Sequence, residues 1–136
     1  MRTEWEPTAT PAPKLGATET ITQISTALLS DSRTFVITNP ADQSSIATGI
    51  TSSQISELIS SLTNAQEGTS KWIDNISHRG LTGNTGSITA ILTSAKSDNL
   101  QISLWVNEDN HVNLIEITGT ITHDGKKFSK LHISPE

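Results

Sequence analysis

The fold of this chain is decided between Thr51 and Gly119, where the sequence reads TSSQISELISSLTNAQEGTSKWIDNISHRGLTGNTGSITAILTSAKSDNLQISLWVNEDNHVNLIEITG. Segments with apolar residues at helical spacing alternate there with segments whose apolar residues recur at every second position. The two periods distinguish amphipathic helices from half-buried strands. Their order predicts an α+β domain in which two helices pack on an antiparallel sheet.

The first helix is predicted to begin after Thr51. Thr51 and Gln54 have the spacing of a capping box, in which each side chain bonds to the backbone amide of the other residue. Four apolar residues follow at i, i+3, i+4 and i+7: Ile55, Leu58, Ile59 and Leu62. They form one stripe that faces a core.

Two further segments have helical spacing. Ser87–Ala95 repeats the stripe with Ile88, Ile91, Leu92 and Ala95, although its GSITAIL sequence also suits a strand by propensity alone. Glu19–Leu29 predicts a short helix nearer the start of the chain, from Ile21, Ile24, Leu28 and Leu29. We take Ser87–Ala95 as the second helix of the central stretch.

Strands are predicted between and after these helices. Asp74–Asn75 and Asp124–Gly125 are typical of hairpin turns, and adjacent Leu114 and Ile115 suggest a bulge. The predicted strand segments are Arg33–Thr38, Ile46–Ile50, the hairpin Thr69–Thr82, Leu100–Val106, Val112–Ile121 and Phe128–Ser134. Trp105 lies on the face opposite Leu104, where it either packs on the outer surface of the sheet or forms a contact surface for a partner, and we favour packing.

The domain organisation follows from length and proline content. The first 18 residues contain Pro7, Pro11 and Pro13 among small Thr and Ala residues, which predicts a flexible tether over residues 1–18. Residues 19–136 are then expected to form a single domain with a core of its own. No signal peptide or anchoring Cys is present, which fits a mature form or a fragment of an exported protein.

Composition and motifs argue against several functions. The net charge of −5 disfavours binding to nucleic acid or to an anionic membrane. The absence of Cys removes thiolate chemistry, and the spacing of His78, His111, His123 and His132 predicts no metal site. The glycines Gly80, Gly83 and Gly86 lack the Lys of a phosphate-binding loop. Asp109 and Asp124 sit in turns, which Asp favours through its own bonds to the backbone, so we do not expect them to bind calcium. No nucleophile motif is present, so we expect neither an enzyme nor a cofactor.

The order of these elements resembles the LppX/LprAFG (LprG-like) lipoprotein family over residues 51–119. The residues that carry the likeness are the helix ending at Leu62–Asn64, Trp72–Ile76 at the family's turn, Leu81–Gly83, Leu104–Val106, Leu114–Ile115 and Ile117–Gly119. The resemblance implies a LolA-like half-barrel, a curved antiparallel sheet with two helices on its concave face.

The resemblance also implies a function. Its members look like non-catalytic carriers of the bacterial cell envelope, which shelter the acyl chains of lipids or lipoglycans between sheet and helices. The residues expected to line such a space here are Ile55, Leu58, Ile59, Leu62, Ile88, Ile91, Leu92, Ile102, Leu104, Ile115 and Ile117. An extracytoplasmic location follows, either membrane-anchored or secreted.

This chain is shorter than the chains of the family and has no lipid-modified Cys. Two hypotheses follow from the shorter sheet. A second copy completes the barrel as a homodimer, or the cavity has closed into an ordinary core. In the second case the alternative function is a small envelope or secreted module that binds another protein and holds no ligand.

Overall fold

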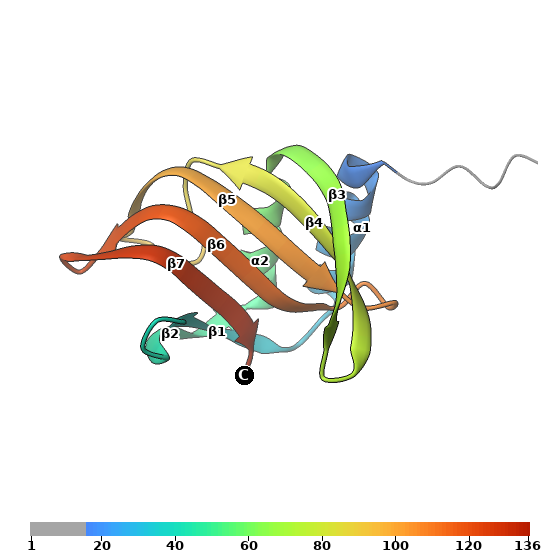
Figure 1. The fold of residues 1–136 in the computed structure, drawn as a ribbon, viewed down its shortest axis with the longest axis horizontal. Helices are drawn as coiled ribbons and strands as arrows, with labels where there is room; N and C mark the ends of the chain where they lie inside the picture. Colours follow the sequence, from blue (N-terminus) through green and yellow to red (C-terminus); the bar gives the residue numbers. More distant parts are fainter. Residues whose placement is uncertain (1–15) are drawn as a thin grey trace, which may run out of the picture.

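A curved seven-stranded antiparallel sheet and two helices make up the computed structural model, which describes residues 16–136 (Figure 1). The elements are α1 (Ala17–Leu29), β1 (Thr34–Asn39), β2 (Ser44–Thr51), α2 (Ser52–Ser60), β3 (Thr63–Ile73), β4 (Ile76–Thr85), β5 (Lys96–Val106), β6 (Val112–His123) and β7 (Lys126–Pro135). The predicted fold class is therefore confirmed. Most of the predicted tether, residues 1–15, lies outside the described residues, and its last two residues begin α1.

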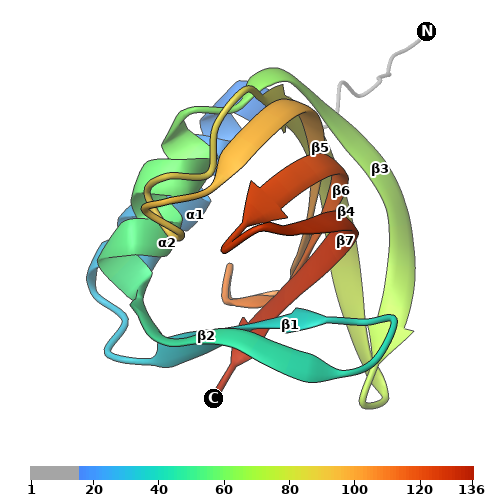
Figure 2. The ribbon, with the colours of Figure 1, turned by 90° about the vertical axis from the view of Figure 1, so that its left-hand side faces the viewer.

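The strand order explains how the open side of the sheet is covered. The order is β2-β1-β7-β6-β5-β4-β3, so β2 and β3 are the two edges of the sheet. These two strands are consecutive along the chain, and only α2 and a short turn join them. The helix therefore bridges the open side of the half-barrel, and both helices lie on its concave side (Figure 2).

The capping box predicted for α2 is present. The hydroxyl of Thr51 accepts a hydrogen bond from the Gln54 amide at 3.1 Å, and the Thr51 amide donates to Oε1 of Gln54 at 2.9 Å. Ile55, Leu58 and Ile59 are buried on the inner face of the helix. The helix ends at Ser60, so Leu62 lies just beyond it, half-buried in the connection to β3.

The predicted helix over Ser87–Ala95 was wrong. Residues 86–95 form a loop in which the amides of Ile91 and Leu92 both donate to the carbonyl of Ile88, at 3.0 Å each. Local side chains compete for the other amides, because the Thr89 amide donates to Ser87 Oγ at 3.2 Å. Hydroxyl side chains that bond to nearby backbone in this way favour turns over helix. The second helix of the fold is instead α1, from the segment predicted at Glu19–Leu29.

The bulge predicted beside Leu114 is present one residue earlier. Trp105 pairs with Leu114 and Val106 with Val112, so Asn113 is left without a partner on β5. The extra residue lets Val112 and Ile115 both point into the core, although they are an odd number of positions apart. The hairpin predicted at Asp74–Asn75 is also present, as the turn between β3 and β4.

Candidate functional site

The interior between the sheet and the helices is almost entirely aliphatic. Its core cluster contains Phe35 as the single aromatic side chain, together with Ile, Leu, Val and Ala. Among the described residues, the buried polar side chains are those of Thr20, Ser52, Ser56 and His78. No charged side chain is therefore buried in this part of the chain, and the medium inside the domain resembles hydrocarbon.

The structure brings the eleven predicted lining residues together in this interior. Ten of them are at most 4% exposed, and Leu62 packs against them half-buried. They come from α2 (Ile55, Leu58, Ile59), from the loop 86–95 (Ile88, Ile91, Leu92), from β5 (Ile102, Leu104) and from β6 (Ile115, Ile117). The loop thus delivers to the core the residues that a helix was expected to deliver.

Sequence reasoning missed another wall of the interior. Ile24 and Leu28 of α1, Phe35 and Ile37 of β1, and Leu131 and Ile133 of β7 all belong to the same cluster. The apolar stripe of α1 was visible in the sequence. The contribution of β1 was not, because it depends on the pairing of β1 with β7 at the opposite end of the chain.

A groove of about 210 Å³ opens on the surface between α1, the end of α2 and the start of β3. Its walls carry hydroxyl groups, and its apolar lining includes Ile21, Ile59 and Leu62. Ile59 is fully buried and is also part of the core cluster. This side chain therefore separates the groove from the aliphatic interior.

The two helices are joined to each other by serine hydroxyls. Ser25 Oγ lies 2.5 Å from Ser56 Oγ and 3.0 Å from Ser60 Oγ, and Ser56 Oγ donates to the carbonyl of Ser25 at 3.2 Å. The helix backbones approach the sheet most closely at its two edges, α1 at β3 and α2 at β2. The two helices are therefore joined as one unit, which lies on the concave side of the sheet.

The loop 86–95 is attached to this unit. The side-chain amide of Gln54 donates to the carbonyl of Ala90 at 3.1 Å, and Ser61 Oγ lies 3.2 Å from Thr85 Oγ1. Figure 2 shows the loop beside α2 on the concave side of the sheet. The helices and the loop together form the cover of the interior.

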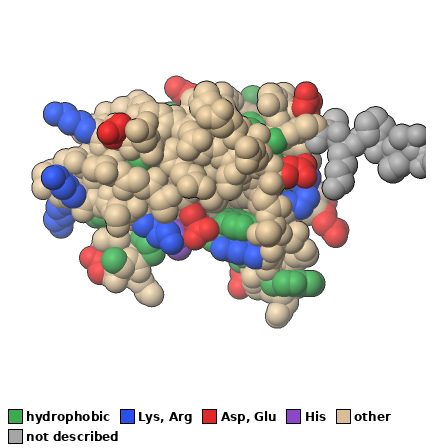
Figure 3. Space-filling view, turned by 45° about the horizontal axis from the view of Figure 1, so that its top comes forward, with side chains coloured by type: hydrophobic (Ala, Val, Ile, Leu, Met, Phe, Trp, Pro, Cys, Tyr) green, Lys and Arg blue, Asp and Glu red, His purple; other side chains and the backbone are tan. Residues whose placement is uncertain are grey.

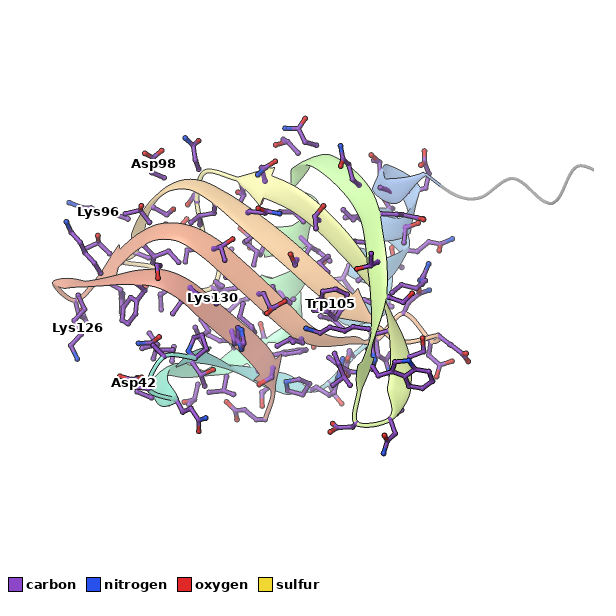
Figure 4. The ribbon with its side chains drawn as sticks, in the orientation of Figure 1. Asp42, Lys96, Asp98, Trp105, Lys126 and Lys130 are labelled. Carbon is purple, nitrogen blue, oxygen red and sulfur yellow. The ribbon has the colours of Figure 1, made fainter. Side chains whose placement is uncertain are left out.

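The outer face of the sheet carries a polar cluster around Trp105 (Figure 4). The indole Nε1 donates to Glu116 Oε1 at 2.9 Å, and Lys71 Nζ lies 4.4 Å from the ring centroid and 3.6 Å from the same oxygen. His132 Nε2 is 3.3 Å from Glu116 Oε2. Partial burial raises the pKa of Glu116, but Trp105, Lys71 and His132 outweigh it and the net shift is downward. Trp105 is thus packed on the sheet surface, as expected.

The far end of β5, β6 and β7 carries lysines. Figure 4 shows Lys96 and Lys126 at this end, with Asp98 and Asp42 nearby. Hydrogen bonds from the side chain and amide of Ser44 lower the pKa of Asp42, and the charge of Lys126 contributes to the shift. Carboxylates are interleaved with the lysines, so this end does not present a surface of one sign.

The four histidines remain apart. His78 is buried, with Nδ1 2.8 Å from the carbonyl of Ile76 and Nε2 2.8 Å from the Asn113 side chain. His123 lies 3.4 Å from Asp124 in the β6–β7 turn. Within residues 16–136, no three His, Asp or Glu side chains are grouped as ligands for a metal ion.

Comparisons with known proteins find similarity in structure only. No family model and no curated protein matches the sequence. Among solved structures, the crystal structure of lipoprotein LppX from Mycobacterium tuberculosis matches with a TM-score of 0.55 and 12% identity, over 88% of this chain and 93% of that chain. Among the described residues, no helix has the length and hydropathy to cross a membrane. The likeness confirms the predicted resemblance at the level of fold, and this chain has the curved α+β fold of lipoprotein LppX.

Proposed function

We propose that this protein is a non-catalytic carrier that binds the acyl chain of a lipid or lipoglycan between its sheet and its helices. The observation that carries the proposal is the aliphatic interior, which a two-helix cover separates from the surface groove at Ile59. The fold of a bacterial lipoprotein supports it, and with it a place in the cell envelope.

Binding requires the cover to move. The groove of about 210 Å³ is smaller than the roughly 300–1,000 Å³ of a typical ligand pocket, so it admits only the end of an acyl chain. Further entry displaces Ile59 and lifts the helix pair from the sheet. Each methylene group that enters contributes about 0.8 kcal/mol, and the entering chain replaces contacts among Ile and Leu side chains with similar ones.

A groove-filling variant tests this route. Thr22 is an exposed residue of α1 that lines the groove, so Thr22→Trp fills it without disturbing the core. Excluding only two methylene groups costs about 1.6 kcal/mol, which is roughly tenfold in Kd. We expect that loss in a titration with a fluorescent long-chain fatty acid. Gln23→Trp, on the neighbouring exposed position outside the groove, is the matched control.

Two results would contradict the proposal. One is a wild-type protein that does not bind the fatty acid and carries no acyl compound in native mass spectrometry after expression in a lipid-producing bacterium. The other is equal affinity in the Thr22 and Gln23 variants, which would place the ligand elsewhere.

A second function is favoured by the close packing of the core. Ten predicted lining residues are already buried against one another, as expected of a closed domain that binds another protein without a ligand. Absence of acyl binding would support this alternative. The completion of the barrel by a second copy stays a prediction, which sedimentation of the protein with and without fatty acid checks.

A further inference from the structure

The tip of the β3–β4 hairpin exposes large apolar side chains. Trp72 is 73% exposed and Ile76 is 51% exposed. In the register of the hairpin, Ile73 pairs with Ile76 and Trp72 pairs with Ser77, so adjacent positions place apolar groups on both faces of the ribbon. The tip is therefore an apolar wedge and not the edge of a buried core.

The hairpin projects from the body of the protein and is held at its base. Figure 1 shows the tip extending beyond the neighbouring strands, and Figure 3 shows hydrophobic side chains on the corresponding projection. Arg79 Nη2 donates to Asn110 Oδ1 at 2.8 Å, and Lys71 lies against Trp105. Asp74 and Asn75 both have positive φ, as in the tight turns that suit a twisted hairpin. The wedge is thus presented on an anchored support.

The apolar surface continues from the tip onto the outer face of the sheet. A groove of about 410 Å³ lies between the hairpin and the end of β7, and its apolar lining is Ile73, Ile76, Leu114 and Pro135. Its polar lining includes Asp74, His78, Asn113 and Ser134. This mixture of apolar and polar side chains suits a surface that enters only the headgroup region of a bilayer.

The size and charge of this surface decide between possible partners. A stable protein interface buries about 800 Å² on each partner, and two exposed side chains among Asp74, Asn75 and Ser77 fall well short of that area. A bilayer interface requires less, because a Trp ring is itself at home at the boundary between headgroups and acyl chains. The net charge of −5 and the carboxylate of Asp74 at the tip disfavour an anionic surface. The partner that fits is a bilayer of electrically neutral lipids.

We propose that the β3–β4 hairpin tip docks the protein reversibly on a neutral bilayer by inserting Trp72 and Ile76 into the interfacial region. Two apolar side chains bury less apolar surface than a single lipid anchor, so the attachment is weak and reversible. The hairpin and the helices lie on opposite sides of the molecule, so the docked protein presents its helix pair away from that bilayer (Figure 2). This docking does not depend on the acyl-binding function proposed above.

Sedimentation of the full chain with vesicles of pure phosphatidylcholine tests the docking. We expect the wild-type protein to bind the vesicles. Trp72→Ala should lower the partition coefficient by roughly tenfold or more, and the double variant that also carries Ile76→Ser should lower it further. Leu29→Ala removes a side chain that is 65% exposed on α1, and it should stay within about twofold of wild type. Urea unfolding shows whether each variant is folded. We expect all of them to fold, because Trp72, Ile76 and Leu29 are exposed.

Several outcomes would overturn the proposal. These are no binding of the wild-type protein to phosphatidylcholine vesicles, equal binding of the Trp72 and Leu29 variants, or binding only to vesicles with phosphatidylglycerol that high salt abolishes. The last result would assign the contact to the lysines at the other end of the sheet. The groove variant Thr22→Trp should bind vesicles like wild type, so failure of docking and failure of acyl binding are distinguishable.

Discussion

Gly80 lies directly beneath the indole ring of Trp105. A Cβ atom placed on Gly80 would fall 2.6 Å from Cζ3 of the ring and 2.6 Å from the carbonyl oxygen of Thr69. Gly80 pairs with Trp105 across β4 and β5, so the ring occupies the space that a side chain would fill. The absence of a side chain at position 80 thus leaves room for the Trp105 ring, which its contacts with Lys71 and Glu116 hold in place.

Gly80→Ala should therefore destabilise the domain. The added methyl group meets backbone on one side and a packed ring on the other, and overpacking of this kind costs about 1–3 kcal/mol. Urea unfolding measures the loss. Gly86→Ala is the matched control, because nothing lies within 4 Å of a Cβ at that position. Equal stability of the two variants would show that the ring moves away freely.

Glu116 should make stability depend on pH. Its pKa is lowered from the ordinary value of 4.5, because Trp105, Lys71 and His132 together outweigh the effect of burial. A carboxylate with a depressed folded pKa stabilises the protein above its unfolded pKa, and this contribution is lost as the pH falls through the folded pKa. At pH 7, Glu116→Gln should lower the free energy of unfolding by roughly 1–2 kcal/mol.

The difference between wild type and Glu116→Gln should shrink below about pH 4.5, where Glu116 becomes protonated in the unfolded and then in the folded protein. Thermal unfolding across this range checks it. Glu57→Gln, on an exposed position of α2, should leave stability within about 0.5 kcal/mol of wild type. A constant difference at all pH values would contradict a role for the charge of Glu116.

Gln54 has two separable roles. Gln54→Glu keeps an oxygen for the capping box but loses the amide that donates to Ala90, whereas Gln54→Ala loses both contacts. We expect Gln54→Ala to cost about 1–2 kcal/mol of stability, and Gln54→Glu to cost less. Hydrogen exchange should nevertheless be faster in residues 86–95 of both variants. Unchanged exchange in Gln54→Glu would show that the loop does not depend on this contact.

The loop 86–95 should contribute to stability as a buried element. Ile91 is 3% exposed and belongs to the core cluster, so Ile91→Ala should lower the free energy of unfolding by about 2–4 kcal/mol. Thr93→Ala, on an exposed position of the same loop, should change it by less than about 0.5 kcal/mol. Similar unfolding midpoints for both variants would mean that the loop is detached from the core in solution.

Local patterns in the sequence predicted most of the fold. The capping box at Thr51, the turn at Asp74–Asn75 and the alternation from Leu100 to Val106 each depend on neighbours in sequence, and each is present in the structure. The segment Ser87–Ala95 has the apolar spacing of a helix and buries the expected residues. Its backbone is not helical because the Ser87 hydroxyl bonds to the hydroxyl and the backbone amide of Thr89. The spacing of apolar residues contains no information about such hydrogen bonds.

The sequence predicted which aliphatic side chains are buried together, and their role as a lining for acyl chains stays a prediction. Periodicity gave the apolar stripes of the eleven aliphatic residues, the family resemblance suggested their lining role, and the structure places them in one interior. The surface groove depends on the approach of α1 to the end of α2 and to β3, elements that are distant in the chain. The exposed tip at Trp72 was equally hidden, since strand alternation alone does not show how far a hairpin projects beyond its sheet.

The pairing of β1 with β7 has a consequence for biosynthesis. Phe35 lies opposite Pro135, so the N-terminal hairpin has no neighbouring strand until β7 has been synthesised. Until then, the backbone groups on one side of β1 have no hydrogen-bond partners in the sheet, and Phe35 lacks the core residues that β7 contributes. The β1 positions from Phe35 to Thr38 therefore complete their sheet contacts only after β7 has been synthesised, so β7 is needed before the sheet can assemble around the N-terminal hairpin.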